Sequence, residues 1–171
     1  MNFSEHLWIN VPLDTVWTRV HDLRSAPEYI PFLDQAESVE PGGLALGSHV
    51  RFTFRRGSQT LRSEAVVTAY EPQQRIALRG QVPGVNATVD VDWQFLAERG
   101  GTRWGQELTI TFGSRLAEMA GKAIIGTMLN EARILEGMEL VKSDLERSYR
   151  EEHGTPGPPG TPGAADKPPA G

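Results

Sequence analysis

The sequence predicts an α+β fold in which a curved antiparallel sheet of six to seven strands wraps around one long C-terminal helix. Two observations predict it. Between residues 48 and 112, apolar and polar residues alternate in consecutive segments separated by short turns, which is typical of an antiparallel meander with one covered face. From about residue 115 to 150 the apolar spacing changes to three or four residues, which predicts a helix that covers this face.

The N-terminal segment predicts a strand followed by a helix. Residues 3–10 alternate between apolar and polar side chains, as an edge or half-buried strand does. Pro12 suits the first turn of a helix, and Asp14 in that turn is favoured by the helix dipole. We expect this helix to end near Leu23. Residues 28–33 predict a second, short helix or turn.

Five further strands are predicted in the meander, at residues 48–55, 60–71, 75–80, 87–97 and 102–112. The strand at 87–97 alternates most regularly, with Ala87, Val89, Val91, Trp93 and Phe95 on one face. The turn at 98–101 contains two glycines and predicts a hairpin to the last strand.

We predict one domain over residues 1–150 and a disordered tail over residues 151–171. The tail is dominated by proline and glycine and has almost no bulky apolar residues. Such a segment cannot bury enough apolar surface to offset its chain entropy.

The order of these elements carries a family resemblance. The motifs are Val11-Pro12, Asp14, Val16-Trp17, Asp22, Tyr29-Ile30-Pro31-Phe32 and the Gly100–Trp104 hairpin. Over about residues 1–150 the chain resembles the SRPBCC (helix-grip) superfamily, which contains START domains, polyketide cyclases and plant pollen allergens. Two branches are most similar: the polyketide cyclase/dehydrase-like lipid-transport group, and a group similar to one of the subunits of carbon monoxide dehydrogenase, which residues 113–126 resemble. The resemblance implies an internal cavity between sheet and helix that binds a hydrophobic ligand.

Composition excludes several other classes. Hydrophobic residues make up 39% and charged residues 23%, which is ordinary for a soluble globular protein. The net charge of −5, without a basic block, does not favour nucleic-acid binding. There is no cysteine, which excludes disulfides and favours a cytoplasmic location. The N-terminus does not resemble a signal peptide, and no apolar stretch is long enough for a transmembrane span.

No metal or cofactor site is predicted. None of the four histidines lies three or four residues from another, and no zinc-binding, nucleotide-binding or nucleophile motif occurs.

The C-terminal helix has one charge on its predicted apolar face, at Glu131. A carboxylate buried without a partner costs several kcal/mol or takes up a proton. In one interpretation the helix bends at Gly126, and Glu131 reaches an open cavity mouth or an arginine. In the other, Glu131 and Thr127 face the ligand, and the carboxylate orients a polar head group or accepts a proton.

The predicted ligand-binding residues are Phe52, Phe54, Val91, Trp93, Gln106, Leu108, Thr127, Glu131 and Leu135, with Glu131 as the candidate catalytic residue. Gln106 interrupts an otherwise apolar strand face. It is either a hydrogen-bonding group of the pocket or the partner of a buried backbone group.

Three functional hypotheses remain. The first is binding or transport of a small hydrophobic molecule, such as a lipid, a quinone or an aromatic polyketide-like compound, with entry gated by the 81–86 loop, the 56–59 turn and the start of the long helix near Gly113. The second is an aromatase/cyclase-type enzyme that acts on such a molecule. The third is an accessory module that binds a protein partner or forms a homodimer.

Overall fold

The computed structural model describes residues 1–154 except residues 31 and 83. The sheet has seven antiparallel strands in the order β1-β7-β6-β5-β4-β3-β2, so the first strand lies beside the last. The strands are β1 (Asn2–Ile9), β2 (Leu33–Ser38), β3 (His49–Arg56), β4 (Gln59–Glu71), β5 (Arg75–Gln81), β6 (Ala87–Glu98) and β7 (Gly101–Phe112). The predicted fold class is confirmed.

Six of the seven strands lie within one or two residues of the predicted segments. The strand missing from the prediction is β2. Its register to β3 shifts between Leu33 and Gln35, so its two buried apolar residues, Leu33 and Ala36, are three positions apart. The irregularity hides the two-residue period by which a strand is recognised in a sequence.

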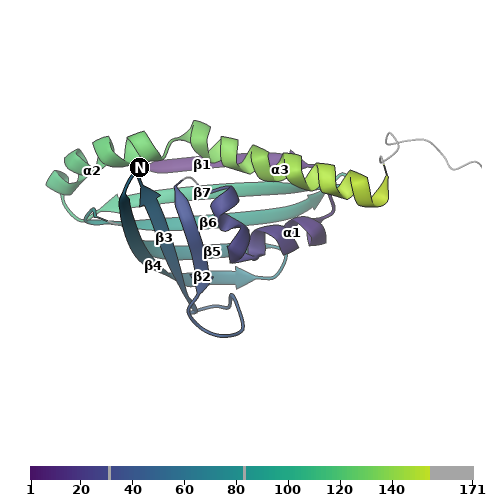
Figure 1. The fold of residues 1–171 in the computed structure, drawn as a ribbon, viewed down its shortest axis with the longest axis horizontal. Coiled ribbons are helices and arrows are strands. Elements are labelled where there is room, and N and C mark those ends of the chain that lie inside the picture. Colours follow the sequence, from purple (N-terminus) through teal and green to yellow (C-terminus); the bar gives the residue numbers. More distant parts are fainter. Residues whose placement is uncertain (31, 83, 155–171) are drawn as a thin grey trace, which may run out of the picture.

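Helices close one face of the curved sheet. The helix α1 (Leu13–His21) is followed by the 3-10 helix η1 (Leu23–Glu28), and the C-terminal helices are α2 (Arg115–Met128) and α3 (Glu131–His153). Figure 1 shows α3 running along β1 and β7, with α2 beyond it at the opposite end of the sheet from α1. The segment expected as a short helix or turn at 28–33 includes turn residues at Tyr29 and Phe32. The short helix η1 precedes it, and Asp22 caps η1 by accepting a hydrogen bond from the backbone N–H of Arg24.

The expectation of one unbroken helix over 115–150 is wrong in its middle. Leu129 and Asn130 have extended backbone angles, and Asn130 is the N-cap of α3, whose side chain accepts a hydrogen bond from the N–H of Arg133 at 3.0 Å. A second helix therefore begins at Glu131, where the sequence pattern predicts that a single helix continues. The predicted tail, residues 151–171, overlaps the end of α3 up to His153, and residues 155–171 lie outside the described part of the chain.

The sheet carries two kinds of interior side chain. At one end of β6 and β7, the large residues Trp93, Phe95 and Trp104 face α1 and η1. At the other end, smaller aliphatic residues form cross-strand pairs, Val91 with Leu108 and Val89 with Ile110. We call these the filled half and the hollow half of the interior. The difference in side-chain size positions the site described next.

Candidate ligand cavity

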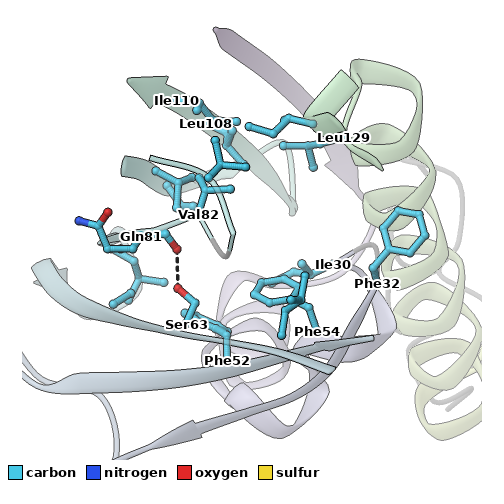
Figure 2. A pocket seen from close by; sticks show the side chains of 18 of the residues that line it. Ile30, Phe32, Phe52, Phe54, Ser63, Gln81, Val82, Leu108, Ile110 and Leu129 are labelled. Atoms are coloured by element: carbon cyan, nitrogen blue, oxygen red, sulfur yellow. Dashed lines mark hydrogen bonds between the residues drawn. The ribbon is translucent and has the colours of Figure 1, made fainter. Parts of the chain in front are cut away.

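A cavity of about 360 Å³ occupies the hollow half of the interior (Figure 2). Its wall comes from β3 to β7, from the segment after η1, and from the residues around the α2–α3 junction. Six of the predicted binding residues line it: Phe52, Phe54, Val91, Trp93, Gln106 and Leu108. The sequence prediction did not include Ile30, Phe32, Ser63, Ala65, Leu78, Val89, Ile110, Ile125, Leu129 and Ile134, which also line it.

Glu131 lies elsewhere. It is exposed in the first turn of α3, and within the described residues it makes no ion pair. This position explains why the sequence has a carboxylate here, because a carboxylate in the first turn of a helix is stabilised by the helix dipole. The prediction that it lies on the apolar face of one continuous helix is wrong. The missed signal was Asn130, a preferred N-cap residue directly before an acidic one.

Two further predicted residues come from the same helical region. Leu135 is 36% exposed and is not among the residues that line the cavity. Thr127 belongs to the last turn of α2, and its side chain is outside what the structure describes. Their part in ligand binding stays a prediction.

The described wall of the cavity is uncharged. Among the described residues that line it there is no aspartate, glutamate, lysine, arginine or histidine. Gln106 is the buried polar residue of the wall, with 9% of its surface exposed. The remaining polar side chains are Gln59, Ser63 and Gln81 on β4 and β5. Figure 2 shows the amide of Gln81 directed away from the cavity, while its backbone carbonyl accepts a hydrogen bond from the hydroxyl of Ser63.

The boundary between the two halves of the interior is aromatic. The Tyr29 ring meets Trp93 and Trp104 edge to face, at centroid distances of 6.0 and 5.7 Å. The Tyr29 hydroxyl donates a hydrogen bond to the carbonyl of Val20, and burial raises the pKa of this phenol well above its usual value. Both indole N–H groups, of Trp93 and Trp104, are buried without an acceptor among the described residues. Because Trp93 also lines the cavity, this boundary is at once core and wall.

Phe32 connects the wall to the start of α3. Its φ of 61° lies in the left-handed region, which is rare for a bulky side chain. The guanidinium carbon of Arg133 lies 5.3 Å from the centre of its ring, within cation–π range. The ring and Ile30 are visible beside the C-terminal helix in Figure 2.

The segments expected to gate the cavity lie around it. Gln59, the last residue of the 56–59 turn, lines the wall, as do residues 81, 82, 84 and 85 of the 81–86 loop. The helix α2 contributes Ile125 and packs closely on this loop. A Cβ added to Gly121 would lie 2.4 Å from the Phe112 ring and 3.0 Å from Val85. The outer face of α2 exposes Leu116 and Met119, at 79% and 72%.

Two other kinds of feature are absent from the residues that the structure describes, and a second hollow is of a different kind. In that part of the chain, no three histidine, aspartate or glutamate side chains gather as metal ligands would. None of the described helices is long and apolar enough to cross a bilayer. A second hollow, between α1 and α3, is a polar groove whose charged residues include Asp14, Arg19 and Asp144.

Comparison with known proteins identifies the relatives of this chain. The model of the family described as polyketide cyclase/dehydrase and lipid transport matches residues 2–146. This is the first of the two branches that the sequence resembles. No curated protein matches the sequence.

Solved structures share the helix-grip fold at low sequence identity. A protein of Deinococcus radiodurans has a TM-score of 0.64 and 20% identity, over 86% of this chain and 98% of that one. An aromatase/cyclase from Streptomyces sp. R1128 has a TM-score of 0.62 and 15% identity, over 91% and 99%. The protein Ara h 8.0201 has a TM-score of 0.61 and 14% identity, over 85% and 97%. These likenesses show the fold.

Proposed function

Because the chain belongs to the polyketide cyclase/dehydrase and lipid transport family, we propose that it reversibly binds a small hydrophobic molecule, such as a lipid, quinone or aromatic polyketide-like compound, in the cavity of the hollow half. The observation that carries the proposal is the cavity itself. A space of about 360 Å³ inside a domain of this size is far larger than the packing voids of ordinary cores. It falls at the small end of the range for ligand pockets, about 300–1,000 Å³.

The energetics of the wall favour an apolar guest. Phe52, Phe54, Leu108 and Ile110 face the space with aliphatic or aromatic carbon. Each Å² of apolar ligand surface that leaves water contributes about 25 cal/mol, and this gain has to exceed the loss of the ligand's translational and rotational freedom.

Entry of the ligand is expected to pass the segments that border the cavity. The helix α2 is followed by the extended residues Leu129 and Asn130, and the described residues that pack it on the sheet side include Gly121 and Ile125. We propose that α2 and the 81–86 loop move together to admit the ligand. The exposed Leu116 and Met119 show that the outer side of this helix is not held by the rest of the described chain.

The cyclase alternative is less well supported by this cavity. Cyclisation and dehydration need an acid or base placed against the substrate. No ionisable side chain is among the described residues of the wall, and Glu131 points into solvent at the start of α3. If a turnover assay is found, we expect Glu131→Gln to leave the rate unchanged. A loss of turnover with ligand binding retained would instead restore Glu131 as a catalytic residue.

The experiment is native mass spectrometry of the purified protein, followed by exposure to a mixture of lipids, quinones and aromatic compounds. We expect a one-to-one complex with a small molecule, either co-purified or taken up. Val91→Phe places a ring in the cavity and should abolish uptake, whereas Leu96→Phe, at a 59%-exposed position of the same strand, should not. A protein that remains free of ligand under all conditions would refute the proposal and favour the partner-binding hypothesis.

A further inference from the structure

The cavity wall has one buried polar side chain and no charged one in the part of the chain that is described. We infer that the ligand is uncharged and carries a single hydrogen-bonding group, a hydroxyl or carbonyl, that is held by Gln106. This inference rests on the proposed function and specifies the chemistry of its ligand.

The side chains around the cavity favour an uncharged ligand. A carboxylate, phosphate or ammonium group that enters an apolar cavity loses its hydration, and the cost is several kcal/mol unless an opposite charge meets it. Among the described residues that line the cavity, none carries such an opposite charge. By register the ionisable neighbour of Gln106 is Glu5 on β1, a half-buried carboxylate that would repel an anion.

The position of Gln106 indicates where a hydrogen-bonding group of the ligand would lie. Gln106 lies on β7 between Trp104 and Leu108, where the filled half ends and the hollow half begins. Its amide supplies both a donor and an acceptor, so it can bind a hydroxyl or a carbonyl group. No hydrogen bond joins it to another described side chain, so a ligand group can approach its amide from the cavity. On β6 it is paired with Trp93. This tryptophan is 1% exposed, and its indole N–H has no acceptor among the described residues.

Together these residues form a weakly polar end to an apolar space. Buried polar groups without partners are uncommon in folded proteins, and each has a cost that a ligand can remove. A ligand oxygen beside Gln106 would meet the donor and the acceptor of its amide at the inner end of the cavity, and the apolar remainder would extend past Leu108 and Ile110.

The test uses four compounds that share a ten-carbon chain: decane, decanol, decanoic acid and decylamine. Each displaces the uncharged fluorescent probe N-phenyl-1-naphthylamine, and affinities are compared near pH 6 and pH 8. We expect decanol to bind best, decane about fivefold to tenfold more weakly because it lacks the hydrogen bond, and decylammonium worst. Decanoic acid should lose about tenfold in affinity for each pH unit, because only its small protonated fraction can bind.

Variants separate Gln106 from the rest of the wall. Gln106→Leu, or Gln106→Met if the first variant folds poorly, should remove the preference for decanol over decane while decane itself still binds. The matched control is Gln94→Leu, the same exchange at an exposed position of the neighbouring strand, which should keep the preference.

Three outcomes would overturn the inference. Decanoate affinity that does not depend on pH would show that the cavity accepts an anion. If that affinity disappeared in Arg133→Gln, the head group would sit beside Arg133 at the start of α3, outside the cavity wall. Tight binding of decylammonium would assign the polar end to Glu5. Failure of all four compounds and of the probe would overturn the proposed function itself, and this inference with it.

Discussion

The two halves of the interior are built from the same strands and differ in what fills them. On β6 and β7, Trp93 and Trp104 pack against Tyr29 and Phe95 stacks on Trp104. The smaller Val89, Val91 and Leu108 a few residues away line a cavity. The filled half therefore stabilises the fold by close packing, whereas the hollow half is less closely packed and has space for a ligand. The difference teaches that a change in side-chain size along a strand is enough to place a site.

The largest effect is expected where α3 meets the filled half. A Cβ added to Gly137 would lie 2.1 Å from the carbonyl oxygen of Tyr29, which is backbone and cannot rotate away. Gly137→Ala should therefore lower the free energy of unfolding by about 3 kcal/mol. Chemical denaturation measures this change.

The matched control lies in the hollow half. A Cβ on Gly126 of α2 meets nothing within 4 Å, so Gly126→Ala should raise stability by about 0.5–1 kcal/mol through better helix propensity. Equal effects at the two glycines would mean that α3 does not pack on the Tyr29 segment as described.

A second comparison enlarges a side chain in each half. Ala26→Leu adds volume to a fully buried position beside the aromatic cluster and should cost about 1–3 kcal/mol. Val91→Phe fills existing space and should change the unfolding free energy by less than about 1 kcal/mol. Thermal and urea unfolding of both variants check this. A large loss in Val91→Phe would show that the hollow half is not open.

The smallest expected effect concerns the cap of η1, the element before Tyr29. Hydrogen bonds from the Arg24 side chain hold the pKa of Asp22 below its usual value. A depressed pKa in the folded state means that the charged cap stabilises the fold above about pH 4, and that this contribution is lost as the pH falls through the folded-state pKa.

Asp22→Asn keeps a capping oxygen and removes the charge. We expect it to be less stable than the parent at pH 6, by less than about 1 kcal/mol because the pair is exposed to solvent, and equal to it near pH 2. Unfolding free energies measured across this range would show the two curves converging. A gap that stays constant with pH would assign the difference to geometry rather than charge.

The regular parts of the fold could be predicted from the sequence because their patterns are local. The alternation along residues 87–97 and 102–112 indicates both strands, and the same faces supply Val91, Trp93, Gln106 and Leu108 to the cavity. These side chains point inward whatever the rest of the chain does, so their place on the wall follows from the two-residue period alone.

The parts that could not be predicted depend on single residues or on distant contacts. Asn130 ends one helical pattern and starts another, and the three-to-four-residue spacing continues across it, so Glu131 was placed on the wrong surface. Ile30 and Phe32 reach the cavity because η1 and the following residues fold back against β3 and α3. No local sequence pattern predicts that these two residues lie against the cavity.

The most direct test of the central claim is a titration followed by ¹⁵N–¹H correlation spectra, with N-phenyl-1-naphthylamine as the ligand. We predict that the largest changes in amide chemical shift occur in the hollow half, at residues such as Val89, Val91, Leu108 and Ile110. Changes at Phe95 and Trp104 should be small. Shifts confined to the polar groove between α1 and α3, or spread over the filled half, would contradict the claim that this cavity is the binding site.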